Sequence, residues 1–168
     1  SGRVLYEKDS EKKLPMASTT KIVTAITIIE NCNVEDEITI PESCVGVEGS
    51  SIYLKAGERY KIIDLLYGLM LRSGNDAAES LAVCVGGSIE GFAGLMNETA
   101  KRAGSVNSCF KNPHGLPDSG HYTTAYDLAK ISCYAMKSDI FKKIVSAKTY
   151  TATELISGEK KVWKNKNK

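Results

Sequence analysis

Apolar residues at helical spacing mark the first long element of the chain. Ile22, Ala25, Ile26 and Ile29 occupy the i, i+3, i+4 and i+7 positions of a buried helical stripe. Pro15 suits the first turn of such a helix, where its fixed φ angle and missing N–H are tolerated. We therefore expect a buried helix that starts close to Pro15 and ends before position 32.

A pair of apolar helices follows later in the chain, joined by a short polar link. The residues Ile62, Leu65, Leu66 and Leu69 repeat at helical spacing, and the pattern stops over residues 72–76. It resumes over residues 77–84, where Asn75 or Asp76 is expected to cap the next helix. The segment 73–75, Ser-Gly-Asn, should thus form a tight connection between two packed helices.

The remaining elements are shorter. Ser88 is expected to cap a helix that runs to position 103 and stops at Gly104, and Thr124 with Asp127 resembles a capping box that opens another helix. Asp139 should start one more short helix. Residues 37–40 and 150–153 are expected as strands, residues 1–6 as a turn and strand, and residues 51–54 as an extended part of a loop.

Composition and charge narrow the class of protein. The 168 residues are 42% hydrophobic and 25% charged, which is typical of one globular domain with a real core. The net charge of +2 and the scattered lysines argue against a nucleic-acid-binding surface. The longest apolar run is too short to cross a bilayer.

The cysteines and histidines suggest neither a metal site nor a cofactor. Five cysteines, an odd number without a Cys-x-x-Cys pair, read mostly as small core residues, and a Cys32–Cys44 disulfide is a less favoured alternative. His114 and His121 lack ligand spacing and are interpreted as polar loop residues.

Ser18 and Lys21 fall on the same predicted stripe and place a hydroxyl and an amine one helical turn apart. An inward-facing lysine loses hydration, which lowers its pKa and lets the neutral amine take a proton from serine. The same spacing occurs at Ser10 and at two other serines, so the spacing alone is weak. The alternative is an ordinary helix cap with a lysine whose amine reaches solvent. Only Ser18 stands at the head of a long apolar helix.

Three segments together resemble a known family. The first is Pro-Met-Ala-Ser-Thr-Thr-Lys at 15–21, the second Leu-Arg-Ser-Gly-Asn-Asp-Ala-Ala at 71–78. The third comprises Asn-Pro-His-Gly-Leu-Pro-Asp at 112–118 and His-Tyr-Thr-Thr-Ala-Tyr-Asp-Leu-Ala at 121–129. In this order and spacing they closely resemble the serine-type D-alanyl-D-alanine carboxypeptidases, the low-molecular-mass penicillin-binding proteins of the bacterial cell wall.

The resemblance implies an acyl-enzyme that removes the terminal D-alanine from peptidoglycan stem peptides. Ser18 would be the nucleophile, Lys21 its base and the Ser18 N–H half of an oxyanion hole. Ser73 would relay a proton to the leaving amine, Asn75 would orient Lys21 and the substrate amide, and Gly74 would line the substrate site. It implies no cofactor, β-lactam antibiotics as covalent inhibitors, and a location in the cell wall, outside the cytoplasmic membrane.

The resemblance also implies a mixed α/β fold of the serine β-lactamase and DD-peptidase type, mainly helical here. The family's third motif, Lys-Thr-Gly on a strand facing the serine, does not occur in residues 1–168. We therefore expect one partial catalytic domain, truncated at both ends, with the helical part and an incomplete antiparallel sheet. Such a chain should have little activity, should reach a membrane only through segments outside it, and could form a homodimer through an uncovered helical stripe.

Two other functions are kept as alternatives. A β-lactamase of the same fold would need an additional base for deacylation, and we find no convincing Glu-x-x-x-Asn loop. A non-catalytic module could use the fold for binding or assembly. Reaction with penicillin distinguishes the three, because the carboxypeptidase keeps a stable adduct, the β-lactamase turns the drug over and the module does not react.

Overall fold

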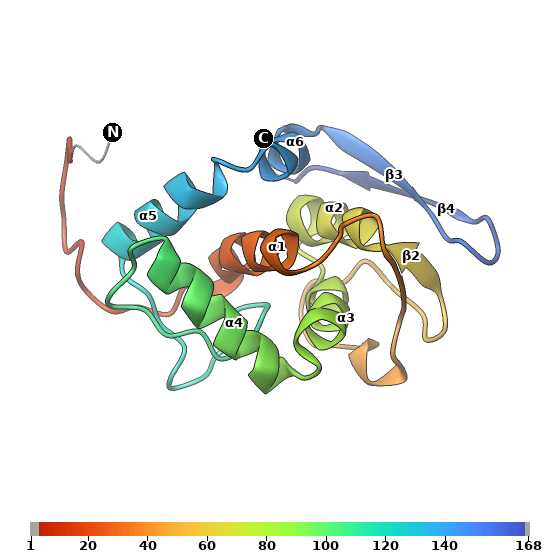
Figure 1. Cartoon of the computed structure of the whole chain (residues 1–168), viewed down its shortest axis with the longest axis horizontal. Coiled ribbons are helices and arrows are strands. Elements are labelled where there is room, and N and C mark those ends of the chain that lie inside the picture. The colour runs from red at the N-terminus through yellow and green to blue at the C-terminus, as the bar shows by residue number, and fades with distance from the viewer. Residues whose placement is uncertain (1–3, 167–168) are drawn as a thin grey trace.

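A helical body carrying a β-hairpin makes up the computed structural model, which describes residues 4–166 (Figure 1). The α-helices are α1 (Thr20–Asn31), α2 (Ile62–Arg72), α3 (Asn75–Gly86), α4 (Ile89–Arg102), α5 (Ala125–Ala135) and α6 (Asp139–Ser146). The strands are β1 (Glu37–Thr39), β2 (Arg59–Lys61), β3 (Thr149–Thr153) and β4 (Lys160–Lys164). Short 3₁₀ turns, η1 (Ala17–Thr19) and η2 (Glu42–Cys44), complete the list.

Helix α1 runs through the middle of the body, where it contacts α2, α3, α4, α5 and α6 (Figure 1). Because it has neighbours on nearly all sides, Thr24 and Thr27 are as fully buried as Ala25 and Ile26, whereas Ile22 and Ile29 are only partly buried. The expectation of a single buried stripe is therefore wrong, since most of the helix surface is covered. The stripe was also expected to be open for pairing, and at Ala25 and Ile26 it is not.

The helix starts and caps follow the sequence at α4 but not at α1 or α3. The Ser88 hydroxyl accepts a hydrogen bond from the Gly91 N–H at the start of α4, and Gly104 adopts a φ of +88° after its end, as predicted. Helix α1 starts at Thr20, after the η1 turn, and not close to Pro15. Helix α3 has Gly74 at its N-cap position without a side-chain cap, so the expected cap by Asn75 or Asp76 is wrong.

The expected capping box at α5 is half formed. Thr124 accepts from the Asp127 N–H at 3.0 Å. The Asp127 carboxylate does not return to Thr124 but binds the 105–108 turn, where it accepts from the Ser105 hydroxyl at 2.8 Å and the Asn107 N–H at 2.6 Å. This carboxylate is fully buried and thus ties a distant turn to the helix start.

Two small antiparallel sheets are present among the described residues. Strand β1 pairs with β2, and β3 pairs with β4 in a hairpin that packs on α2. Tyr67 of α2 stacks on Tyr150 of β3 with ring centroids 3.7 Å apart, and Trp163 of β4 lies beyond Tyr150 at 6.4 Å. The predicted strands at 37–40 and 150–153 are confirmed within one residue. The predicted mainly helical fold with an incomplete antiparallel sheet is also confirmed.

Some sequence expectations fail outside these elements. Residues 51–54 lie in a loop, as expected, but Tyr53 has φ +58° and is therefore not extended, and Ile52 and Leu54 are buried. Of the strand expected at residues 1–6, positions 1–3 lie outside the described residues and positions 4–6 are exposed without strand structure. All five cysteines are free, so the Cys32–Cys44 alternative is excluded. Only Cys44 is buried, and Cys84 and Cys133 are exposed, which contradicts their reading as core residues.

Residues 4–166 contain neither a candidate membrane-spanning helix nor a candidate metal site. No helix there combines the length and the apolar character that a bilayer requires. No group of three histidine, cysteine or acidic side chains in that range could hold a metal ion.

Candidate active site

Lys21 is at the centre of the hydrogen-bond network that the sequence placed around Ser18. Its amine donates to the Ser18 Oγ at 3.4 Å, to the Asn75 Oδ1 at 2.7 Å and to the His114 carbonyl at 2.9 Å. The two residues do not share one buried stripe as expected: Lys21 is 2% exposed, whereas Ser18 is exposed on the η1 turn. The nucleophile candidate thus faces solvent while the base candidate stays inside.

The environment of Lys21 shifts its protonation equilibrium toward the neutral amine. Burial lowers the pKa of Lys21 from 10.5 to about 8, and the negative charge of Asp76 opposes part of this effect. A lysine with a pKa this close to neutrality can act as a proton acceptor. The condition that the sequence argument required, an inward-facing lysine that loses hydration, is met at this position.

Asn75 is fixed in an orientation that offers its oxygen to Lys21. Its Nδ2 donates to the Glu48 carbonyl at 2.6 Å, and its backbone N–H donates to the Ser50 carbonyl at 2.7 Å. The amide nitrogen is therefore directed at the 48–50 loop and the Oδ1 at the amine. An asparagine clamped at both ends loses little further freedom when it binds a partner.

Asp76 holds the loop that clamps Asn75. Its buried carboxylate accepts from the Ser51 hydroxyl at 2.6 Å and from the N–H groups of Ile52 and Leu54, each at 3.1 Å. Three donors from one loop on one carboxylate fix the loop against the start of α3. Sequence reasoning assigned Asp76 only a capping role and missed this function.

Ser73 and Gly74 form the link between α2 and α3. Ser73 adopts φ +63° and ψ +35°, a left-handed conformation that is unusual for a serine. Its Oγ is buried and has no hydrogen-bond partner among residues 4–166. At Gly74 a Cβ would lie 2.9 Å from the Asp76 Oδ1 and 3.1 Å from the Ile52 Cγ2, so a larger residue there would have to displace these side chains. A role of Gly74 in binding substrate stays a prediction.

The 110–123 loop packs against the first turns of α1, which also meet Asn75 at the start of α3. Thr24 donates from its Oγ1 to the Pro113 carbonyl at 2.7 Å. Gly115 has φ +91°, and a Cβ there would lie 1.9 Å from the Ala17 carbonyl oxygen. Ala17 itself has φ +47°. Left-handed non-glycine residues such as Ala17 and Ser73 cluster at functional sites, where surrounding contacts hold the strain.

The two histidines lie in a loop, as predicted, but both are buried against the start of α1 and are not merely polar loop residues. His114 is 7% exposed and His121 is 4% exposed. The His121 Nδ1 accepts from the Lys111 N–H at 2.9 Å, so its Nε2 carries the proton and donates to the Thr20 Oγ1 at 2.8 Å. Burial lowers the pKa of His121. Both residues lie in segments that carried the family resemblance, and that was the only signal for them.

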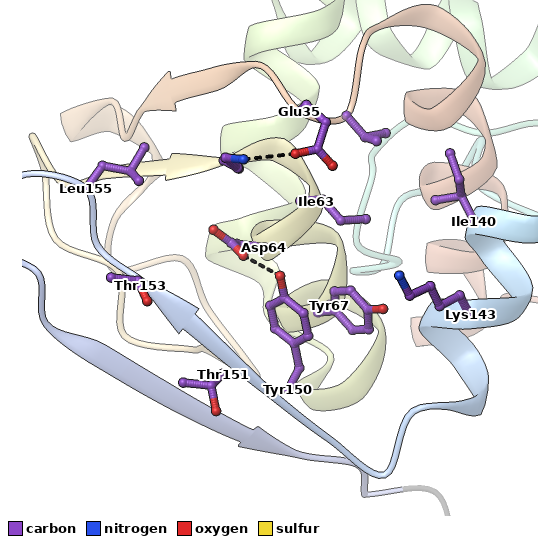
Figure 2. Close-up of a pocket in the computed structure, with 12 residues that line it drawn as sticks. Glu35, Ile63, Asp64, Tyr67, Ile140, Lys143, Tyr150, Thr151, Thr153 and Leu155 are labelled. Atoms are coloured by element: carbon purple, nitrogen blue, oxygen red, sulfur yellow. Dashed lines mark hydrogen bonds and ion pairs between the residues drawn. The ribbon is translucent and has the colours of Figure 1, made fainter.

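A separate pocket of about 530 Å³ lies away from these residues, between α2, α6 and β3 (Figure 2). Figure 2 shows Tyr150 donating to the Asp64 carboxylate at 2.5 Å on one side and Lys143 extending from α6 toward Tyr67 on the other. None of the predicted site residues lines this pocket.

The arrangement around Ser18 can support nucleophilic catalysis. It contains a solvent-facing hydroxyl, a buried amine with a lowered pKa and an oriented amide oxygen that holds this amine. The structure thus brings Ser18, Lys21 and Asn75 together. Ser73 and Gly74 adjoin Asn75 in the chain, but the Ser73 hydroxyl bonds to none of the other three.

Comparison with known proteins gives a consistent result. The sequence model of the D-alanyl-D-alanine carboxypeptidase family matches residues 1–168. The chain is 36% identical over 168 residues to the D-alanyl-D-alanine carboxypeptidase DacF of Bacillus subtilis, covering 97% of this chain and 43% of that protein. It is 34% identical over 183 residues to a D-alanyl-D-alanine carboxypeptidase of a Streptomyces species, covering 99% and 63%.

Solved structures agree with these matches. The Streptomyces K15 DD-transpeptidase superposes with a TM-score of 0.87 at 34% identity, over 96% of this chain and 68% of that one. An evolved putative penicillin-binding protein homolog, Rv2911, from Mycobacterium tuberculosis superposes with a TM-score of 0.93 at 27% identity, over 99% and 63%. The chain spans less than half the length of the Bacillus relative and under two thirds of the Streptomyces relative.

Proposed function

Because the chain belongs to the D-alanyl-D-alanine carboxypeptidase family, we propose that Ser18 attacks the D-Ala-D-Ala amide of peptidoglycan stem peptides and forms an acyl-enzyme. The terminal D-alanine leaves, and water then hydrolyses the acyl-serine. The observation that carries this proposal is the buried Lys21 amine between the Ser18 hydroxyl and two carbonyl oxygens.

Lys21 acts as the base in this reaction. A neutral amine has two N–H groups and one lone pair. The Asn75 Oδ1 and the His114 carbonyl oxygen accept the two N–H groups, which leaves the lone pair for the Ser18 hydroxyl. With a pKa of about 8, roughly one Lys21 in ten is neutral at pH 7. Alkaline conditions therefore increase the reactive fraction.

Ser73 and Asn75 complete the proton path in our proposal. The Ser73 hydroxyl, buried and without a partner among the described residues, passes a proton to the leaving amine. Asn75 orients Lys21 and the substrate amide. The backbone N–H of Ser18 supplies half of the oxyanion hole, a type of donor whose loss costs about 3 to 4 kcal/mol. Gly74 borders the bound peptide.

The absence of Lys-Thr-Gly from residues 1–168 bears on the activity of this chain. In the family, that strand supplies the groups that bind the substrate carboxylate and the other oxyanion donor. We propose that residues 1–168 are one part of a catalytic domain and react slowly alone. Pairing of two chains stays a prediction, although Ala25 and Ile26, two of the four residues in the stripe on which it was based, are covered.

The partners and location follow from the same proposal. β-Lactams would acylate Ser18 in place of the stem peptide, and the substrate places the reaction in the bacterial cell wall, outside the cytoplasmic membrane. The proposed chemistry needs no cofactor, because the nucleophile and the base are both side chains.

Mass spectrometry after incubation with penicillin tests the proposal. We expect a stable adduct on Ser18, formed slowly by residues 1–168 and faster by a fusion in which the Lys-Thr-Gly region of a relative follows residue 168. Ser18→Ala should abolish the adduct and Lys21→Ala should nearly abolish it. An adduct on another residue, or labelling of Ser18→Ala at the wild-type rate, would show that the nucleophile is misassigned. Rapid turnover of the drug would indicate a β-lactamase, and no reaction in either protein a binding module.

A further inference from the structure

Glu79 lies one helical turn after Asn75 on α3, so the two side chains occupy neighbouring positions on one helix face. The Glu79 Oε1 lies 3.2 Å from the His114 Nε2, and the Glu79 side chain is 21% exposed. Neither the sequence pattern nor the proposed mechanism uses this carboxylate. It nevertheless contacts the side chain of His114, the residue whose backbone carbonyl accepts a hydrogen bond from Lys21.

The hydrogen bonds of His114 define its protonation. The Nδ1 accepts from the Leu116 N–H at 3.1 Å, so in the neutral ring the proton is on Nε2, which donates to Glu79. The titratable groups that face the ring are Glu79, Lys21 and His121. Burial and the nearby Lys21 lower the pKa of His114 to about 4, so the ring is neutral near pH 7. Burial raises the pKa of Glu79.

The backbone of the same residue reaches Lys21. The His114 carbonyl accepts from the Lys21 amine at 2.9 Å, while both nitrogens of its ring are engaged by other groups. A ring held at both nitrogens restricts the peptide to which it is attached. Asn112 adds a second restraint on this loop, because its Oδ1 accepts from the Gly115 N–H at 2.7 Å.

We infer that Glu79 is a positioning residue that acts through His114 to hold the His114 carbonyl oxygen against Lys21. The inference rests on the proposed function of Lys21 as the base. Helix α3 would then hold the lysine twice, directly through Asn75 and indirectly through Glu79 and His114. Both acceptors are needed, because an amine that keeps one free N–H can turn its lone pair away from Ser18.

The test compares Glu79→Ala, which removes the acceptor, with Glu79→Gln, whose amide oxygen can still accept from the His114 Nε2–H. Glu98→Ala is the matched control, since Glu98 is exposed on the neighbouring helix α4. The first readout is the titration of Lys21, followed in the 168-residue chain by NMR of its Cε in ¹³C-lysine-labelled protein. The second is the rate of penicillin acylation per folded molecule, with the melting temperature measured in parallel.

We expect the pKa of Lys21 to fall by roughly half a unit to one unit in Glu79→Ala, because the ammonium loses a charge-assisted hydrogen bond. Acylation should slow by roughly ten- to a hundredfold, as expected for a misplacement approaching 1 Å. Glu79→Gln should restore both quantities to near the wild-type values, and Glu98→Ala should change neither.

Two results would overturn the inference. If the role of Glu79 is purely structural, its loss in Glu79→Ala admits water and the pKa of Lys21 rises toward 10.5, or the pKa does not change. A Glu79→Gln variant as impaired as Glu79→Ala would show that the charge, and not the hydrogen bond, matters. Failure of the wild type to react with penicillin would count against the proposed function instead, because the NMR titration reports on the position of Lys21 without any reaction.

Discussion

Replacement of Lys21 by methionine should make the stability of the protein depend differently on pH. Methionine keeps an unbranched apolar stem and does not titrate. In the unfolded chain a lysine has a pKa near 10.5, whereas burial lowers the pKa of Lys21 to about 8 in the folded protein. Between these values the unfolded chain holds more protons than the folded one. The free energy of unfolding of the wild type must therefore rise with pH across this window.

The magnitude follows from the same two values. Below pH 8 both states hold the proton, and the folded state carries the full penalty of the buried charge, about 3 kcal/mol for the difference between 10.5 and about 8. Above pH 10.5 both states are neutral and the penalty is gone. The variant also leaves the Asn75 and His114 oxygens without a donor, which costs about 1 to 3 kcal/mol each but does not depend on the ionisation of Lys21.

Urea unfolding followed by circular dichroism at several pH values between 7 and 10.5 measures this effect. The quantity of interest is the wild-type free energy of unfolding minus that of Lys21→Met, because other titrating groups are common to both proteins. We expect this difference to increase by about 3 kcal/mol over the window. Lys55→Met, at an exposed loop lysine, controls for the loss of one positive charge. A difference that stays constant with pH would refute the lowered pKa and, with it, the reason for calling Lys21 a base.

Three further predictions concern the neighbours of Lys21 and the loops around it. Asn75→Ala should slow penicillin acylation and lower the melting temperature by only a few degrees. The reason is that the Asn75 side chain bonds to Lys21 and to the Glu48 carbonyl and fills no core space. A large loss of melting temperature with unchanged acylation would show that Asn75 is purely structural. Gly115→Ala should both destabilise the fold, by at least about 1 to 3 kcal/mol, and impair acylation, since its Cβ would meet the Ala17 carbonyl oxygen at 1.9 Å; a variant with wild-type stability would contradict this packing. For Asp127, burial raises the pKa but four hydrogen-bonding groups lower it more, so the net pKa lies below 3.8. Its carboxylate therefore stabilises the fold above about pH 4 and loses this effect progressively at lower pH. The stability advantage over Asp127→Asn should shrink on acidification in urea titrations, and an advantage that does not shrink below about pH 4 would be inconsistent with it.

Elements with local signals were predicted well. Helix α4 combines a capping serine, inward-facing Phe92 and Met96, and a terminal glycine, all of which act within one or two turns. The strands at residues 37–40 and 150–153 were also predicted, because their signals are local as well. Central helix α1 was predicted with the wrong burial pattern, because its periodicity gives no measure of how many neighbours surround it.

The histidines and cysteines show the limit of composition as evidence. His114 and His121 stand in a loop rich in proline and glycine, which is typical of an exposed segment. They are buried because the loop folds back onto α1, where Thr20 and Thr24 bond to it. Cysteine is usually buried, yet Cys84 and Cys133 face solvent because they lie on the outer faces of α3 and α5.

The sequence by itself determined the chemical pair and its spacing, since residues three apart are neighbours in a helical segment and Ser18 and Lys21 are three apart. Only the tertiary structure decided the surroundings of this pair. The two oxygens that hold the Lys21 amine belong to Asn75 and His114, which are 54 and 93 residues away along the chain. The lowered pKa of Lys21 arises from the water that the surrounding elements exclude, and desolvation is a property of the packed helices that no local pattern contains.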